Sequence, residues 1–434
     1  MPTYEQLPHT RAPAVITSLE YGFAPRSFME RRRHSLGRAF VAHGLYGPGI
    51  FTADPEHIRR LFAADSDALS TSSAVSIVEV VGDRSVLVTS GPPHKRQRKL
   101  LAPPLHGARL REFSAAIQRI ADKHVATLVP GGKLRALGLT TKFTLDVIVQ
   151  TVFGASEEDE ARVLRGLIHE MVRSFPPLFV IVPQLRQSWF PPWARFLSAR
   201  KSFRDWTLAK IRNARRSPER SASVMSLLLD ARYDDASEMD DDEICDQLVT
   251  LLLAGHETTA ITLANCMARV CQHPDIAQGL RDELASTDDV VRAPYLSAFI
   301  DETLRLDVVV PDVGRIANRD FALDEQLSLR KGQLVVISIE GLHMDPELYP
   351  DPHTFRPERF LARKFAPHEF VAFGGGVRRC IGAAFSDLET KLMLASLLRA
   401  HRWQLTRGKL DRRVRRNVTM GPQHGVPIRI AKER

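Results

Sequence analysis

Apolar residues along this chain of 434 residues recur mostly with a helical period, and strand-like stretches are few and short. The helical period extends over residues 107–230, with interruptions at Pro176-Pro177 and Pro191-Pro192, where proline ends or restarts a helix. A further apolar run occupies residues 240–274, and another helical stretch covers residues 386–398. The pattern predicts a protein in which helices dominate.

Strand-like segments are predicted mainly towards the two ends of the sequence. Residues 37–52 mix apolar and turn residues as in a short hairpin, and Asp54-Pro55-Glu56 then marks a helix start. Residues 308–339 are also strand-like, with a turn at residues 330–333, and a basic strand-and-turn tail follows residue 398. No repeat or shift in composition separates these parts. The predicted fold class is mainly α with small β-sheets (α+β), and residues 1–434 are expected to form a single domain.

The composition is that of an ordinary globular protein, with 44% hydrophobic and 26% charged residues. Cysteines are too sparse for a disulfide framework and lack zinc-ligand spacing, which indicates a reducing compartment. They are Cys245, Cys266, Cys271 and Cys380. The first residues contain no apolar stretch of the length of a signal peptide or membrane span. A soluble, cytoplasmic protein without a membrane anchor is therefore expected.

The net charge is +9 and the sequence pI is about 9.6, a balance that raises the question of nucleic-acid binding. The basic residues are dispersed, aromatic residues make up only 7%, and no nucleic-acid-binding module is recognisable. These observations argue against nucleic acid as a partner. A basic face that binds an acidic redox protein explains the charge better.

The segment at residues 373–382, FGGGVRRCIG, carries the most specific chemistry of the chain. A glycine run lets the backbone adopt positive φ and direct N–H groups at one atom. A cysteine thiolate held by iron is such an atom, and arginine beside it suits an anionic group. The spaced positions Phe373, Gly376, Arg378, Cys380 and Gly382 resemble the cysteine-ligand loop of the cytochrome P-450 (haem-thiolate monooxygenase) family.

This resemblance implies the cytochrome P-450 fold, with haem b (iron protoporphyrin IX) between the helix of residues 240–274 and the cysteine loop. Cys380 would be the axial ligand of the haem iron. Phe373, Gly376 and Gly382 would contribute to the cofactor site, and Arg378 would face a haem propionate. Relatives of the microsomal type carry a membrane anchor, so the sequence is more similar to the soluble bacterial type.

The helix predicted over residues 240–274 would be about 50 Å long, enough to cross the molecule. Ala254 and Thr258 lie one turn apart, so the Thr258 hydroxyl can bond the Ala254 carbonyl and loosen the helix. Ala254 and Gly255 are small and leave room for dioxygen, and Glu257 lies beside the hydroxyl, where it can relay protons. His256 is interpreted as a bystander.

This stretch resembles the family's Ala/Gly-Gly-x-Asp/Glu-Thr-Thr segment. The resemblance makes Glu257 and Thr258 the expected catalytic residues and places Ala254 against the haem. A kinked core helix with satisfied polar groups is the alternative interpretation of the stretch by itself.

Two further sets of charged residues match the family. Glu302 and Arg305 lie on one helix face, and the resemblance implies a buried ion network of Glu302, Arg305 and Arg359 that supports the cysteine loop. His94 and Arg98 resemble the pair that holds the haem propionates. Arg315 resembles another propionate ligand beside Arg378.

The sequence departs from the family after Arg305, where a proline usually follows near the third position. Here the run is Leu306-Asp307-Val308-Val309-Val310-Pro311, and Asp312 comes directly after the late proline. In relatives this segment borders the substrate pocket, so the pocket floor is expected to differ. Other pocket segments are expected around residues 71–90 and 173–190, and they are mainly apolar.

The implied reaction is reductive activation of dioxygen and insertion of one oxygen atom into a hydrophobic small molecule, such as a fatty acid, terpenoid, steroid or polyketide-like compound. Cys380 would supply the electron push for O–O cleavage, and Thr258 and Glu257 would handle protons. Three alternatives stay open. They are a peroxygenase that uses hydrogen peroxide, a haem-thiolate isomerase or dehydratase, and a non-catalytic haem-binding sensor or carrier.

No flavin or iron–sulfur segment follows Cys380, so electrons are expected from a ferredoxin or flavodoxin with a nicotinamide-dependent reductase. The expected docking surface gathers Arg378, Arg379 and the basic helix with Lys95, Arg96 and Lys99. A monomer is expected.

Overall fold

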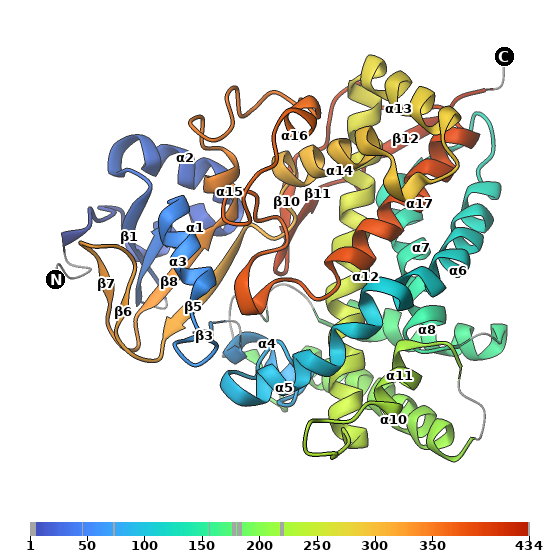
Figure 1. Ribbon diagram of the computed structural model, residues 1–434, viewed down its shortest axis with the longest axis horizontal. Coiled ribbons are helices and arrows are strands. Elements are labelled where there is room, and N and C mark those ends of the chain that lie inside the picture. Colours follow the sequence, from blue (N-terminus) through green and yellow to red (C-terminus); the bar gives the residue numbers. More distant parts are fainter. Residues whose placement is uncertain are drawn as a thin grey trace.

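The computed structural model describes residues 6–45, 47–72, 74–155, 157–175, 179, 185–217 and 221–432, with backbone only for residues 74–76. Its strands lie mainly on one side of the molecule and its helices on the other (Figure 1). Helices make up most of the described chain, and short strands form small sheets. The predicted fold class, mainly α with small β-sheets, is confirmed.

The helices are α1 (Ala14–Phe23), α2 (Pro25–Leu36), α3 (Pro55–Ala63), α4 (Ala74–Val81), α5 (Gly91–Leu101), α6 (Gly107–Ala126), α7 (Ala136–Thr151), α8 (Glu158–Arg173), α10 (Pro191–Arg216), α11 (Val224–Asp230), α12 (Asp241–Gln272), α13 (Pro274–Ser286), α14 (Pro294–Leu306), α15 (Ile339–His343), α16 (Glu358–Ala362) and α17 (Ala383–Ala400). The predicted helices of residues 107–230, 240–274 and 386–398 are all present. Pro191 begins α10, and Pro176-Pro177 lie outside the described residues.

The strands are β1 (Ala39–Gly44), β2 (Gly47–Thr52), β3 (Leu69–Thr71), β4 (Lys133–Arg135), β5 (Asp312–Ala317), β6 (Phe321–Ala322), β7 (Ser328–Leu329), β8 (Leu334–Ser338), β9 (Trp403–Leu405), β10 (Arg413–Arg416), β11 (Thr419–Pro422) and β12 (Pro427–Ile430). The predicted hairpin of residues 37–52 is β1 and β2, and Asp54 caps the helix that follows by accepting backbone N–H bonds.

The largest sheet has the strand order β1-β2-β8-β5-β3 and joins the two ends of the sequence. Strand β2 pairs with β8 in parallel, with Ile50 opposite Val335, and β5 is antiparallel to β8. One hydrophobic core lies around this sheet. Strand β4 departs from the prediction of strands near the two ends, because it pairs with β12 from the middle of the sequence.

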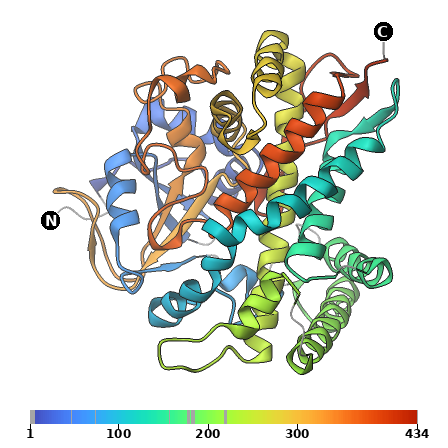
Figure 2. The same ribbon diagram turned by 45° about the vertical axis from the view of Figure 1, so that its right-hand side comes forward.

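A second and larger core surrounds α12, whose 32 residues span about 48 Å. Asp240 caps α12, and Asp241, Asp242 and Glu243 occupy its first turn, where the helix dipole favours acids. Figure 2 shows α12 running through the helical part of the molecule, with α17 crossing it. No helix in the described ranges is long and apolar enough to span a bilayer.

Candidate active site

The cysteine loop connects the core of the sheet with α17 and depends on glycine at specific positions. Gly374 and Gly376 both have positive φ, +64° and +61°, which other residues rarely adopt. A Cβ on Gly375 would lie 2.0 Å from the Phe62 ring. The loop therefore packs directly against the end of α3, and the glycine run is a requirement of that close approach.

Cys380 follows the 3₁₀ helix η5 (Gly376–Arg378), and its N–H donates to the Phe373 carbonyl at 2.9 Å. Phe373, at the start of the loop, is half-buried and packs against the main core. The Cys380 side chain is accessible to solvent, yet surrounding protein raises the pKa of its thiol. The Gly382 N–H and the Arg379 and Arg98 guanidinium groups act in the opposite direction.

Nothing lies within 4 Å of the position that a Cβ on Gly382 would occupy. The accessible Cys380 thiol therefore lies beside a glycine whose Cβ position is open space.

The middle of α12 has the local geometry that the sequence predicts. The Thr258 hydroxyl donates to the Ala254 carbonyl at 2.7 Å, and Ala254 is exposed although it lies mid-helix in the larger core. A Cβ on Gly255 would make an ordinary contact, 3.4 Å from Ile148 Cδ1 on α7, so this glycine lies at the side of α12 that packs on α7.

Glu257 is half-buried, and burial raises the pKa of its carboxyl above the usual range. The Arg416 guanidinium, 4.0 Å away, acts against this rise. His256 is buried, and its Nδ1 lies 3.2 Å from the Leu252 carbonyl of the same helix, in keeping with a bystander.

Sequence reasoning missed a polar contact between α12 and α17. The Thr259 hydroxyl donates to Ser386 Oγ at 3.0 Å, and Glu389 lies one turn further along α17, buried. Burial raises the pKa of the Glu389 carboxyl well above its usual range, while the Thr259 hydroxyl acts in the opposite direction. The sequence of α17 gives little signal for this contact, because Glu389 lies among other charged residues such as Asp387 and Lys391.

A cluster of basic side chains lies beside the cysteine loop. His94 and Arg98 come from α5, Arg315 from β5 and Arg378 from η5. Burial, together with the three arginines, lowers the pKa of His94 to about 4. Burial also lowers the pKa of Arg315 and Arg378 to about 10, and the neighbouring arginines contribute to the value of Arg378. Among the described residues none of the four has an acidic partner within 4.0 Å. The structure therefore brings these predicted residues together as an uncompensated positive site.

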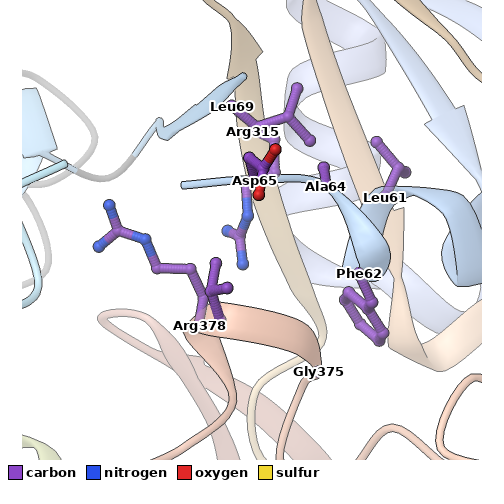
Figure 3. A pocket seen from close by; sticks show the side chains of 9 residues that line it. Leu61, Phe62, Ala64, Asp65, Leu69, Arg315, Gly375 and Arg378 are labelled. Carbon is purple, nitrogen blue, oxygen red and sulfur yellow. The ribbon is translucent and has the colours of Figure 1, made fainter. Parts of the chain in front are cut away.

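Figure 3 shows Arg315 and Arg378 at one pocket, entered from β5 and from the cysteine loop, with Phe62 beside Gly375. Arg378 donates to the Val86 carbonyl at 3.2 Å and to Ser90 Oγ at 2.9 Å, while its Nε is buried without a partner in the described structure. His94 Nδ1 is likewise buried and unpartnered there. These unsatisfied donors call for an acceptor that the polypeptide does not supply.

The predicted ion network of Glu302, Arg305 and Arg359 is formed. Arg305 donates to both Glu302 oxygens at 2.7 and 2.8 Å, and Arg359 Nε lies 3.1 Å from Glu302. Glu302 and Arg305 are completely buried. The Arg356 N–H also donates to Glu302, at 2.9 Å.

Two residues that sequence reasoning missed connect this network to the cysteine loop. Arg305 donates to the His343 carbonyl at 2.9 Å and lies over the Tyr349 ring. The Val371 N–H donates to His343 Nε2 at 3.1 Å, and the Tyr349 hydroxyl donates to the Glu369 carbonyl at 2.8 Å. The network thus holds the segment that leads into the loop.

The expected basic docking surface is only partly present. Arg96 pairs with Asp235 at 3.0 Å, Lys99 pairs with Asp234, and Arg378 turns inward as described. Lys95 and Arg379 are exposed and have no acidic partner within 4.0 Å in the described part of the chain. Of the pocket segments expected from sequence, residues 73, 176–178 and 180–184 lie outside the described residues.

The model of the family described as Cytochrome P450 matches residues 7–426. Cytochrome P450 138 of Mycobacterium tuberculosis is 31% identical over 426 residues, which cover 96% of this chain and 94% of that protein. Cytochrome P450 137 of the same species is 32% identical over 393 residues, 89% and 82% of the two chains.

Two solved structures share the fold. The retinoic acid bound cyanobacterial CYP120A1 superposes with a TM-score of 0.86 at 24% identity, over 100% of both chains. The cytochrome P450DA heme domain superposes with a TM-score of 0.88 at 21% identity, over 99% of this chain and 97% of that one.

The chain belongs to the cytochrome P450 family. It is a cytochrome P450 monooxygenase, an oxidoreductase, and its cofactor is haem. The residues present fit that cofactor. Haem carries two propionates, and the cluster of His94, Arg98, Arg315 and Arg378 offers basic side chains to anions, among them the buried nitrogens His94 Nδ1 and Arg378 Nε that lack a partner in the described structure. An accessible Cys380 beside the open space at Gly382 fits a flat group held by a sulfur ligand.

Proposed function

We propose that this cytochrome P450 uses dioxygen to hydroxylate or epoxidise a hydrophobic small molecule, with Cys380 as the axial ligand of the haem iron. The observation that carries the proposal is the pair of Glu257 and Thr258 in the turn of α12 where the Thr258 hydroxyl bonds the Ala254 carbonyl. A peroxygenase, an isomerase or a haem carrier has no need of a proton-delivering acid and alcohol at this place.

When bound, the haem supplies the reductive activation of dioxygen. The polypeptide positions the haem and the substrate, delivers protons and excludes water from the site. Phe373 and the glycines Gly376 and Gly382 shape the loop that presents Cys380. His94, Arg98, Arg315 and Arg378 orient the cofactor through its propionates.

Protons reach the reaction through Glu257 and Thr258 in this proposal. The raised pKa of the Glu257 carboxyl brings it closer to neutral pH, where an acid both gives and regains a proton readily. The Thr258 hydroxyl donates to Ala254 and keeps free lone pairs that can accept a proton from a neighbour. Ala254 leaves the space that a small oxidant needs.

The substrate is proposed to be apolar, of the fatty acid, terpenoid, steroid or polyketide-like type. The segment after α14, which borders the pocket in relatives, presents Val308, Val309 and Val310. A lining of this kind binds an apolar molecule through the apolar surface that both bury, and it excludes water. Electrons are proposed to come from an acidic ferredoxin or flavodoxin that a nicotinamide-dependent reductase reduces, with the P450 acting as a monomer in the cytoplasm.

Ligation and reaction type are tested on the holoenzyme. With carbon monoxide, the reduced parent protein should show the red-shifted absorption band of thiolate-bound haem, and Cys380→Ser should lose it. Cys245→Ser, Cys266→Ser and Cys271→Ser are the matched controls and should keep it. Substrates found by shifts of the haem absorption band are then turned over with oxygen and reductant, or with peroxide alone. Turnover by peroxide alone would favour the peroxygenase.

A further inference from the structure

The hairpin of β10 and β11 is fixed between the segment after α14 and the middle of α12. The Met420 N–H donates to the Val309 carbonyl at 2.7 Å, which ties β11 to that segment. On the other strand, Arg413 pairs with the buried Glu340 at 2.8 Å. The Arg415 Nε donates to the Gly22 carbonyl at 2.6 Å, which also holds β10. These bonds hold both strands of the hairpin in place. A side chain of the hairpin that points at α12 therefore starts from a fixed backbone position.

Arg416 is the residue of β10 that reaches α12. Successive residues of a strand face opposite sides, so Arg416 points away from the side on which Arg413 and Arg415 are bound. Its stem crosses the facing strand at Gly421, where a Cβ would lie 2.9 Å from Arg416 Cδ and 3.2 Å from Ile261 Cδ1 of α12. Arg416 Nη1 donates to the Pro422 carbonyl at 3.2 Å. This hydrogen bond to the backbone of its own hairpin helps to fix the position of the Arg416 guanidinium.

At the end of this path Arg416 Nε lies 4.0 Å from Glu257 Oε1. Both side chains are about one third exposed, 39% and 34%. The distance is that of a loose ion pair, and only one of the five N–H donors of Arg416 has a hydrogen bond to the described protein. The contact can shift the charge state of Glu257 without locking the carboxylate in place.

Other charged groups near this stretch of α12 face elsewhere. Glu389 on α17 is directed at Thr259, and His256 is buried against its own helix. Helix α7 presents hydroxyls, because Thr144 and Thr140 donate to the carbonyls of His256 and Ala260. Within the described residues, Arg416 is the charged side chain that acts on Glu257.

We infer that Arg416 is a positioning residue for proton delivery, which places a positive charge beside the Glu257 carboxyl from the tip of the β10–β11 hairpin. This inference rests on the proposed role of Glu257. Because the hairpin is bonded to the pocket-bordering segment at Val309, a substrate that moves this segment also moves the charge next to the proton donor.

The test uses holoenzyme labelled with ¹³C-glutamate, in which infrared difference spectra against Glu257→Gln assign the Glu257 carboxyl band. In Arg416→Gln, loss of the positive charge should raise the pKa of Glu257 by about one unit. The alkaline decline of coupling, measured as product formed per reducing equivalent, should move to higher pH with it. Arg416→Lys should restore most of the parent behaviour.

Two further variants complete the design. Gly421→Ala keeps both charges but displaces the Arg416 stem, so it should shift the pKa in the same direction and by less. Arg412→Gln, an exposed residue at the base of the same hairpin, should shift nothing.

An unchanged Glu257 titration in Arg416→Gln and Gly421→Ala would overturn the inference. If Glu257→Gln itself leaves coupling at the parent level, the proposed role of Glu257 fails, and this outcome is recognised before any Arg416 variant is measured.

Discussion

A Cβ atom on Gly376 would lie 2.0 Å from the carbonyl oxygen of Phe62, so the cysteine loop and the end of α3 meet backbone to backbone. Gly376 also has φ +61°, which a larger residue adopts only with strain. We expect Gly376→Ala to push the loop away from α3 and to lower the haem content and the thermal midpoint of the holoenzyme.

Gly374→Ala is the matched control for this prediction. Gly374 has φ +64°, but no atom lies within 4 Å of its Cβ position. Its substitution should cost only the strain of positive φ, about 1–2 kcal/mol. Equal losses in the two variants would show that the contact with Phe62 does not matter.

Thr258→Ala is expected to bind haem and substrate normally but to divert reducing equivalents to hydrogen peroxide. The hydroxyl that bonds the Ala254 carbonyl is lost, and with it the proposed relay from Glu257. We expect product per reducing equivalent to fall roughly tenfold or more. Thr258→Ser, which keeps a hydroxyl, should retain most of the coupling. Parent-like coupling in Thr258→Ala would remove this residue from the mechanism.

Glu302→Gln should destabilise the protein by about 3–5 kcal/mol, because Arg305 and Arg359 keep their charges in a buried site without the carboxylate. Denaturant unfolding of the holoenzyme measures this. Glu56→Gln is the control, since Glu56 and Arg59 have the same sequence spacing but are exposed, and its free energy of unfolding should not change measurably. A similarly small effect at Glu302 would contradict the structural role of the network.

We expect His343 to make the free energy of unfolding depend on pH. Burial, aided by Arg305, lowers its folded-state pKa to about 3, against about 6.5 in the unfolded chain. The unfolded chain therefore binds the extra proton between these values, and the free energy of unfolding should fall as the pH drops from about 6.5 towards 3. In His343→Asn this contribution should disappear. The measurement is the difference in slope between parent and variant over that range.

Electron transfer should depend on Lys95 and Arg379, which are exposed and have no acidic partner within 4.0 Å among the residues that the structure describes. First-electron transfer from an acidic ferredoxin should slow with rising salt, and Lys95→Glu with Arg379→Glu should slow it further at low salt. Arg412→Glu reverses a single charge at the base of the β10–β11 hairpin and should have little effect. If the rate of first-electron transfer changes neither with salt nor with charge reversal, the docking surface lies elsewhere.

Local chemistry made much of the structure predictable from sequence. The long helix of residues 240–274 follows from its apolar period and its acidic cap, and the hydrogen bond of Thr258 to Ala254 follows from their spacing along one helix. The ion network of Glu302, Arg305 and Arg359 could be expected because a motif links positions that are distant in the sequence. The roles of the individual site residues stay proposals.

Contacts without a motif could not be predicted. The approach of Arg416 to Glu257 joins strand and helix across the fold, and nothing local in either segment indicates it. The pairing of Lys99 with Asp234 and of Arg96 with Asp235 depends on how the loop before α12 folds back on α5. The contact of Gly255 with Ile148 likewise depends on where α7 packs against α12.

The positive cluster of His94, Arg98, Arg315 and Arg378 has a thermodynamic consequence. Folding gathers these side chains from three separate regions of the sequence, and the mutual repulsion of the three arginines opposes the folded form. A dianionic cofactor that binds only the folded chain removes this opposition, and it stabilises the protein in proportion to the logarithm of its free concentration. Haem binding and folding are therefore linked equilibria, and a higher concentration of free haem increases the fraction of the protein that is folded.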